Sequence, residues 1–209
     1  MDNLLSHLVR DLDSMQQLIG GDPHPIATQK VFDHLEERAQ AFIQASPFLL
    51  MSTSDAGGGQ DVSPKVDAPG FVWMETSKPL CIPDRPGNKL AFWLKNLLQN
   101  PQIGWLFLLP GTDETLRVSG RAELHAAPEL LEQLAARGKP ALVAIRVDVE
   151  ECFFHCAKAF KRSKLWQPDS WAERFKVSFG KLLAPVVGGD DAMAKEIDDM
   201  VESDYREGL

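Results

Sequence analysis

The hydrophobic pattern of this chain changes period at Pro47, and that change restricts the folds it can adopt. Before Pro47, apolar residues recur at intervals of three and four, which predicts amphipathic helices over residues 1–19 and 28–45. After Pro47, short apolar runs are separated by turns rich in glycine and proline, which is typical of antiparallel strands. We therefore expect helices at the N-terminus, followed by a β-rich segment.

The β-rich segment contains five to seven predicted short strands, interrupted by two predicted helices. A β-hairpin is predicted from PFLLMSTSD and DVSPKVD, which flank the flexible AGGGQ turn. The two helices are predicted from NKLAFWLKNLLQN, which ends at Pro101, and from APELLEQLAARG, which ends at Gly138. This order of elements favours a small antiparallel barrel with helical attachments.

The length and composition fit one main domain. A chain of 209 residues with 44% hydrophobic content can bury a sizeable core. We expect N-terminal helices over residues 1–46, the barrel core over 47–168 and an acidic helical tail over 169–209.

The charge of the chain argues against nucleic acid or a membrane as a partner. The 30 acidic residues outnumber the 22 Lys and Arg and give a formal charge of -8, which repels phosphate backbones and anionic lipids. The longest apolar run, IGWLFLLPG, is far shorter than the ~20 residues that span a bilayer. The N-terminus is acidic and amphipathic rather than signal-like, so a cytoplasmic protein is predicted.

The three cysteines are an odd and sparse set, which indicates reduced thiols rather than a disulfide framework. Cys81 is predicted to be a small buried hydrophobe. Cys152, His155 and Cys156 are residue types that bind zinc. In a strand, however, positions 152 and 156 point to one face and His155 to the other, so the three would not converge. We expect structural or substrate-facing roles for them and no metal site.

A corner with the sequence DRPGNKL follows one of the predicted strands. It combines Arg85 and Lys89 with a sharp Pro-Gly turn, and Asn88 is placed to cap the following helix. A phosphate dianion binds where Arg, Lys and backbone N–H groups converge at a helix N-terminus. The corner therefore predicts an anion site, and the alternative is a solvated turn with an ordinary helix cap.

Four motifs in order, SPKVDAPGF, IPDRPGN, ETLRVSGRA and FHCAKAFKRSKLW, make the sequence resemble the pyridoxamine 5'-phosphate oxidase-related family of FMN-binding split barrels. The resemblance covers about residues 25–170. It implies an α+β fold built on a six-stranded antiparallel split barrel. It also implies a homodimer in which FMN lies in the groove between the subunits.

The resemblance assigns flavin contacts to two parts of the chain. Arg85, Asn88 and Lys89 would hold the phosphate, and the backbone of residues 82–84, ending at Asp84, would run along the ring and the ribityl chain. Ser63 and Lys65 match strand positions whose side chains face the flavin.

Further contacts are implied near the second half of the barrel. Thr115 matches a strand position near the ring or the ribityl hydroxyls. Arg162 and Trp166 belong to a basic segment that would attract the flavin phosphate across the dimer or an acidic substrate. His155 and Lys158 of this segment are candidates for an acid or an anion clamp. A solvated basic turn and a tryptophan packed in the core are the alternatives.

The function implied by the resemblance is that of an FMN-dependent oxidoreductase acting on an unidentified small substrate, which the basic segment suggests is anionic. Pyridoxamine phosphate oxidase itself is not expected, because the chain ends in DDMVESDYREGL where that enzyme has an Arg-rich motif. One alternative is a non-catalytic module that binds, stores or senses flavin or haem. Another is an interaction protein in which the barrel is only a dimer scaffold and the acidic tail binds the partner.

Overall fold

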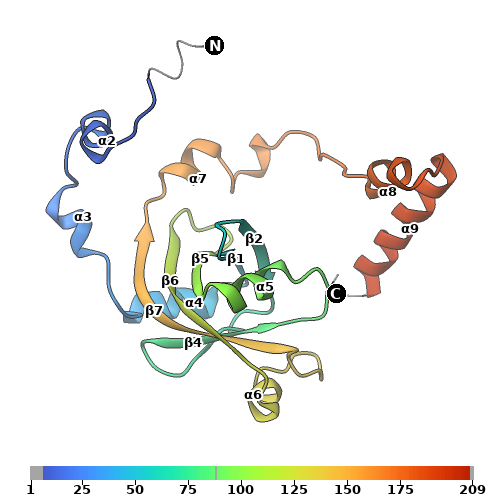
Figure 1. Cartoon of the computed structure of the whole chain (residues 1–209), viewed down its shortest axis with the longest axis horizontal. Coiled ribbons are helices and arrows are strands. Elements are labelled where there is room, and N and C mark those ends of the chain that lie inside the picture. Colours follow the sequence, from blue (N-terminus) through green and yellow to red (C-terminus); the bar gives the residue numbers. More distant parts are fainter. Residues whose placement is uncertain (1–6, 88, 208–209) are drawn as a thin grey trace. The chain divides into compact units, whose positions relative to one another are not determined.

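The computed structural model describes residues 7–87 and 89–207. The chain divides into two compact units, one ending at Trp166 and the other beginning at Gln167, and Figure 1 labels the elements of both. The predicted start of the C-terminal tail, at residue 169, lies close to this division. None of the helices in the described ranges combines the length and the apolar character needed to cross a membrane.

An antiparallel sheet forms the body of the first unit. Its seven strands are β1 (Phe48–Ser54), β2 (Gln60–Val66), β3 (Trp73–Met74), β4 (Pro79–Asp84), β5 (Gln102–Leu108), β6 (Thr115–His125) and β7 (Val143–His155). They lie in the order β2-β1-β5-β6-β7-β4-β3, so the ladder ends at β2 on one side and β3 on the other. The predicted α+β class and the β1–β2 hairpin are confirmed. The sheet differs from the predicted six-stranded barrel, because the two-residue β3 adds a strand and the ladder does not close.

The strands follow the alternation expected of one buried face. In β1, Leu49 and Met51 are fully buried, and in β5 Trp105 and Phe107 are buried against them. Each such side chain contributes about 1.5–3 kcal/mol when it is removed from water. The core therefore lies on the inner face of the curved sheet.

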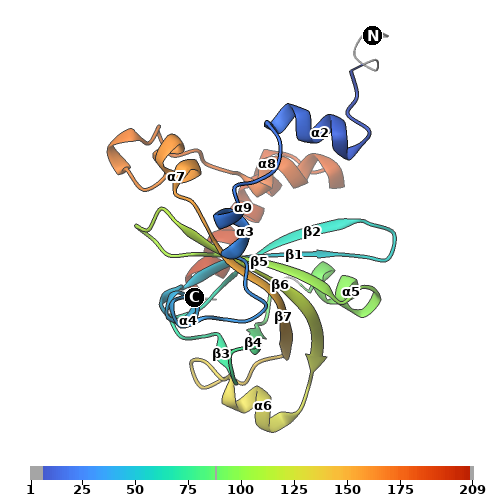
Figure 2. The same cartoon turned by 90° about the vertical axis from the view of Figure 1, so that its left-hand side faces the viewer.

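Two long strands connect the halves of the sheet. The first half of β7 pairs with β4, and β6 pairs with β5 from Leu116 to Arg121, a stretch that contains the bulge at Ser119 and Gly120. Figure 2 shows β6 and β7 running together and curving along their length. This curvature brings the ends of strands from opposite halves of the sheet toward each other.

The N-terminal helices differ from the prediction. The structure has α2 (Leu12–Ile19), α3 (Pro25–Gln29) and α4 (Glu37–Ala45) in place of helices over 1–19 and 28–45, and residues 1–6 lie outside the described part. The second predicted helix is divided because Phe32 forms a β-bridge with Cys152, with N–O distances of 3.0 and 2.8 Å. The helix then restarts at Glu36, whose carboxylate caps the first turn of α4.

Three further helices connect or follow the later strands: α5 (Phe92–Gln99), α6 (Pro128–Gln133) and α7 (Lys158–Ser163). The predicted cap of α5, Asn88, lies outside the described residues. The N-cap of α5 is instead Ala91, in the left-handed region at φ 51°, and it makes no side-chain cap bond. The helix begins late because Lys89 is also left-handed, at φ 62°, which a helix cannot accommodate.

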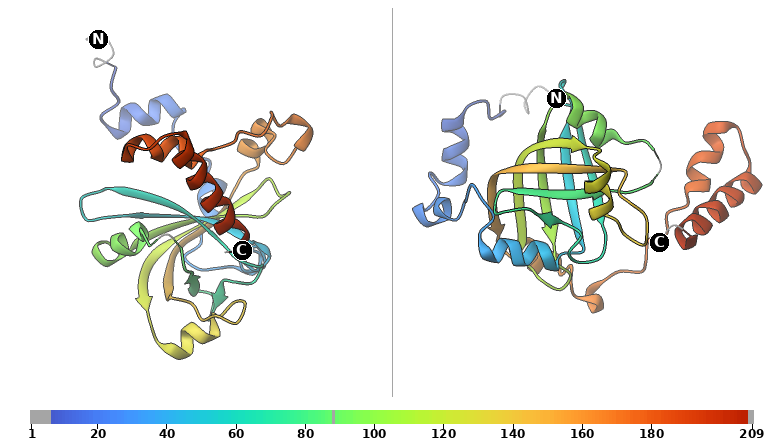
Figure 3. Two further views of the ribbon diagram at one scale, coloured as in Figure 1. Left: turned by 90° about the vertical axis from the view of Figure 1, so that its right-hand side faces the viewer. Right: turned by 90° about the horizontal axis from the view of Figure 1, so that it is seen from below.

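The second unit is a small helical hairpin. It contains η1 (Pro168–Ser170), α8 (Phe179–Leu183), η2 (Ala184–Val187) and α9 (Asp191–Glu207), and Figure 3 shows α8 and α9 side by side. Gly180 permits their close approach, because an added Cβ would lie 1.7 Å from the carbonyl oxygen of Ala194. Asp198 of α9 accepts bonds from the Ser178 hydroxyl at 2.6 Å and the Gly180 N–H at 2.7 Å. The carboxylate thus ties α9 to the start of α8.

Replacing Asp198 with Ala should loosen this hairpin. The Ser178 hydroxyl, followed by the Gly180 N–H, lowers the pKa of Asp198. Its stabilising contribution is therefore present above the unfolded pKa of about 4 and is lost as the pH falls through the lower folded value. Amide hydrogen exchange in residues 178–200 should become several-fold faster in the variant at pH 7. Asp199→Ala, which removes only an exposed ion pair with Lys195, should change it little, and equal effects of the two substitutions would contradict the capping role.

Candidate functional site

The ends of β2 and β4 meet through a buried ion pair. Lys65 Nζ lies 2.7 Å from Asp84 Oδ1, and the two side chains are only 12% and 6% exposed. The pair joins the edge strand β2 to a strand next to the opposite edge of the ladder. The sheet is therefore curled far enough to bring two of the predicted site residues into direct contact.

Lys65 also packs against an aromatic ring. Its Nζ lies 3.5 Å from the centroid of the Trp93 ring, at the start of α5, which is within the range of a cation–π interaction. Burial lowers the pKa of Lys65, although the hydrogen bond that Lys65 donates to Asp84 opposes this shift. A second anion near Lys65 would therefore favour its charged form.

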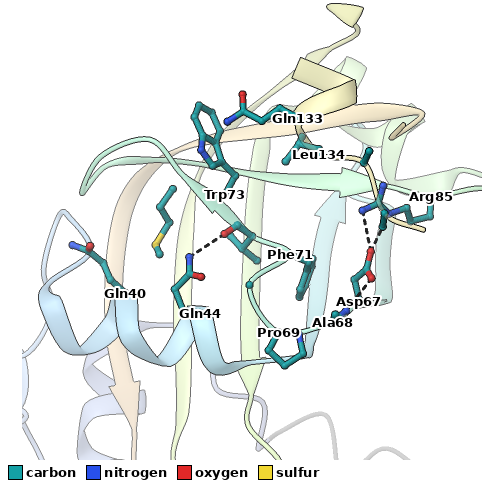
Figure 4. A pocket seen from close by; sticks show the side chains of 15 residues that line it. Gln40, Gln44, Asp67, Ala68, Pro69, Phe71, Trp73, Arg85, Gln133 and Leu134 are labelled. Carbon is teal, nitrogen blue, oxygen red and sulfur yellow. Dashed lines mark hydrogen bonds and ion pairs between the residues drawn. The ribbon is translucent and has the colours of Figure 1, made fainter. Parts of the chain in front are cut away.

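Arg85 pairs with Asp67, which follows β2. Arg85 Nε and Nη2 lie 3.0 and 2.9 Å from the same oxygen of Asp67, and the other oxygen accepts the Ala68 N–H at 2.9 Å. Figure 4 shows this pair beside a cavity of about 510 Å³, whose other walls include α4 and Trp73. The loop thus fixes Asp67, and Asp67 in turn positions the guanidinium.

Two donors beside these pairs lack an acceptor. Arg85 Nη1 and Trp93 Nε1 are buried and have no hydrogen-bond partner among the described residues. A buried donor without a partner costs about 1–3 kcal/mol. Both donors belong to residues that contact the charged side chains at the ends of β2 and β4, so the donor set there fits a phosphate.

The other residues predicted from β2 and from the turn after β4 are close in sequence to Lys65 or Arg85, but their contacts differ. Ser63 is buried on the same side of β2 as Lys65, and its hydroxyl donates to Asp61 at 2.6 Å. Lys89 is exposed in the left-handed turn before α5, and Asn88 lies outside the described residues. The structure therefore brings together Lys65, Asp84 and the neighbouring Arg85.

The site residues predicted from Thr115 onward lie elsewhere in the first unit. Thr115 is buried at the start of β6, three strands from β2, and its register partner is His155 at the end of β7. Lys158 and Arg162 are exposed on α7. In the described parts of the chain, no ion pair or hydrogen bond joins these four residues to Lys65.

Trp166 is held by its own neighbours. Its indole N–H donates to the carbonyl of Thr112 at 2.9 Å, and its ring stacks on Phe160 with 5.7 Å between centroids. The contacts fix the segment after α7 against the β5–β6 connection. They neither place Trp166 in the core nor place it against the Lys65–Asp84 pair.

Four residues near the predicted sites were not predicted. Asp67 and Trp93 complete the two ion-pair groups, and Lys30 and Arg117 lie near His155. Asp67 stands in the SPKVDAPGF motif, where its carboxylate could have been noticed. The indole of Trp93 followed the apolar pattern of a helix, and Lys30 and Arg117 belong to no recognisable spacing.

The cysteines differ in accessibility. Cys152 is buried, and burial raises the pKa of its thiol to about 12, while Cys156 is exposed. Burial also raises the pKa of Cys81, to about 11. Within residues 7–87 and 89–207, no three His, Cys, Asp or Glu side chains are grouped so that they could hold a metal ion.

Comparisons with known proteins give one match to a family. The model of the family described as pyridoxamine 5'-phosphate oxidase matches residues 35–156, which is more than half of the chain. No curated protein matches the chain. The match begins before α4 and ends just after β7, so it contains the whole sheet.

The chain is also similar to solved structures at low identity. HupZ from Group A Streptococcus is 18% identical, with 57% of this chain and 93% of that chain covered and a TM-score of 0.47. HutZ, a haem storage protein from Vibrio cholerae, is 17% identical over 58% and 93%, with a TM-score of 0.41. An FMN-binding protein from Syntrophomonas wolfei is 11% identical over 69% and 96%, with a TM-score of 0.42.

Proposed function

The chain belongs to the pyridoxamine 5'-phosphate oxidase family, and from this premise we propose that it is an FMN-dependent oxidoreductase. Its substrate is a small molecule, and the positive charges of Lys30 and Arg117 near His155 favour an anionic one. The observation that carries the proposal is the meeting of Lys65 and Arg85 at the ends of β2 and β4, beside donors that have no acceptor.

The phosphate of FMN binds at this meeting point. Lys65 has further N–H groups beyond the one that Asp84 receives, and Arg85 has the unpaired Nη1. Lys89 adds a third cation from the turn before α5, and Asn88, the residue before it in the sequence, stays a predicted phosphate contact. The carboxylates of Asp84 and Asp67 keep the two main cations in place before the dianion arrives.

FMN, when bound, supplies hydride transfer, and the residues of this chain position it. Ser63, on the same side of β2 as Lys65, lines the path from the phosphate toward the ring. The backbone of β4 up to Asp84 borders the ribityl chain. Thr115 offers a hydroxyl, and Trp166 and Arg162 complete the site from the other half of the barrel or from the partner subunit.

The protein acts as a homodimer with the flavin between the subunits. β2 is an edge strand, and its Val62 and Val66 are 63% and 66% exposed on the face away from Lys65. An edge strand with exposed apolar side chains is a site of contact with another chain. A second subunit at this edge would cover the valines and close the flavin groove.

The absorption spectrum of the freshly purified protein tests the cofactor. We expect flavin bands that remain after gel filtration, and a mass by light scattering that corresponds to two chains. Mixing with NADH or NADPH, or with a partner reductase, should bleach the flavin, and air should restore it. A colourless protein that takes up no added FMN would contradict the cofactor. Bound flavin that no reductant bleaches would contradict the oxidoreductase and favour a storage or sensing module.

A further inference from the structure

Three cationic or protonatable side chains surround the ring of Phe153 on β7, at a distance along the sheet from the proposed flavin phosphate site. Lys30 Nζ lies 5.4 Å and Arg117 Cζ 5.7 Å from the ring centroid. The His155 ring lies 4.9 Å from it, tilted by 50°. We call Lys30, Arg117, His155 and Phe153 the Phe153 cluster.

The backbone fixes the positions of the cluster. Arg117 is the register partner of Phe153 in the β6–β7 ladder, and His155 is two residues further along the same strand. Lys30 comes from the segment after α3, which the Phe32–Cys152 bridge attaches to β7. Its ammonium donates to the carbonyl of Phe154 at 2.9 Å. Four side chains from three segments are therefore held together by main-chain contacts.

No carboxylate neutralises the cluster. Within the described residues, no ion pair of 4 Å or less involves its three nitrogen-bearing side chains, although the whole chain carries a net charge of -8. Of the acidic residues near it in sequence, exposed Glu114 makes no ion pair with the cluster in the described part of the chain. Asp33 pairs with Lys78, and Glu151 lies opposite Ser119 at the β6 bulge. The cluster is therefore a positive patch in an acidic protein.

The pKa of His155 responds to this positive charge as well as to burial. Burial, followed by the charges of Lys30 and Arg117, lowers the pKa of His155 below 6.5. The imidazole is therefore mainly neutral at pH 7 and can donate or accept one hydrogen bond. An anion bound between the cations would reverse this effect and favour the imidazolium.

We propose that the Phe153 cluster is a binding site for the oxyanion group, phosphate or carboxylate, of a small organic molecule. Lys30 and Arg117 supply charge-assisted donors, and His155 supplies a third donor. The partly buried Phe153 ring offers apolar contact to the carbon skeleton beside the anion. This site is separate from the flavin phosphate site and does not rest on flavin binding.

Nuclear magnetic resonance of the histidine rings tests the proposal. Inorganic phosphate and acetate are titrated separately into the full-length protein at constant ionic strength, and the His155 resonance is assigned with His155→Gln. We expect a saturable shift of the His155 resonance and a higher His155 pKa in the presence of the anion. Half-buried His125, whose ring lies near Glu123, is the internal control and should not respond.

Matched variants separate the site from general attraction of anions. Arg117→Gln or Lys30→Met should lower the affinity for phosphate, measured from the His155 shift, roughly tenfold. This is the effect of losing one charge-assisted bond. Arg121→Gln changes an exposed arginine on the same strand and should leave the response unchanged. The double variant Lys65→Met with Asp84→Asn should also leave it unchanged, because it alters only the flavin phosphate site and leaves no unpaired buried carboxylate. Dispersed amide spectra confirm that each variant is folded.

Saturation by phosphate alone assigns a phosphate-type ligand, and saturation by acetate as well extends it to carboxylates. A His155 resonance that neither anion shifts would overturn the site. An equal loss of phosphate affinity in Arg117→Gln and Arg121→Gln would also overturn the site. Equal losses would show only non-specific attraction of anions to positive charge. A protein that lacks flavin but shows the His155 response would keep this proposal and reject the FMN proposal.

Discussion

Replacing Lys65 with Met together with Asp84 with Asn should weaken FMN binding about 10- to 100-fold, the loss expected for one charge-assisted contact. The double variant is used because Lys65→Met alone would leave Asp84, which is 6% exposed, as an unpaired buried charge. Met has an unbranched apolar side chain like the stem of Lys but no ammonium to meet the phosphate. Titration of FMN with protein, followed by flavin fluorescence, measures the change.

Riboflavin, which lacks the phosphate, separates loss of this contact from loss of the fold. It should bind to the double variant and to the unaltered protein with similar affinity. Lys95→Met removes an exposed lysine from the same helix as Trp93 and is the matched control for both ligands. Unchanged FMN affinity in the double variant would remove Lys65 from the phosphate site. An equal loss for FMN and riboflavin would indicate that the pocket as a whole has changed.

Local patterns predicted the elements that depend on neighbouring residues. The alternation in PFLLMSTSD and DVSPKVD, with glycines between, specifies the β1–β2 hairpin without information from the rest of the chain. The same alternation places Ser63 and Lys65 on one side of β2. The family motifs added the expectation that this side faces a ligand.

Contacts between distant segments could not be predicted in this way. The helical period over 28–45 continues through Phe32, but pairing with Cys152, far along the chain, takes that residue out of the helix. The predicted cap at Asn88 was displaced because left-handed residues delay the start of α5 until Phe92. The helical preference of the local sequence is overridden where long-range pairing or a tight turn determines the backbone.

At the candidate site, too, local patterns predicted single residues but not the contacts between distant segments. Lys65 and Asp84 were each predicted, but their 2.7 Å contact depends on how far the sheet curls, which no local pattern encodes. The pairing of Arg85 with Asp67 was also not predicted, since it joins the loop after β2 to the end of β4. The sequence therefore predicted both cations of the site and the carboxylate of Asp84, but neither the carboxylate of Asp67 nor the two ion pairs.

The curl depends on close backbone contact at Gly120, and replacing it with Ala should destabilise the protein by about 3 kcal/mol. A Cβ at this position would lie 2.1 Å from the carbonyl oxygen of Asp148 and 3.0 Å from its carbon. Both atoms belong to the β7 backbone, so no side-chain rotation can relieve the overlap. The strands must separate at the bulge where the pairing register shifts.

Urea denaturation measures this effect, with Gly104→Ala as the matched control. Gly104 lies in β5, the strand that pairs with β6, and a Cβ there would meet no atom within 4 Å. Its replacement should be neutral or slightly stabilising, because Ala reduces the freedom of the unfolded chain. Equal unfolding midpoints for the two variants would contradict the close contact between β6 and β7. Because the loss at Gly120 is a large part of the 5–15 kcal/mol typical of a domain, Gly120→Ala should also weaken every ligand that requires the curled sheet.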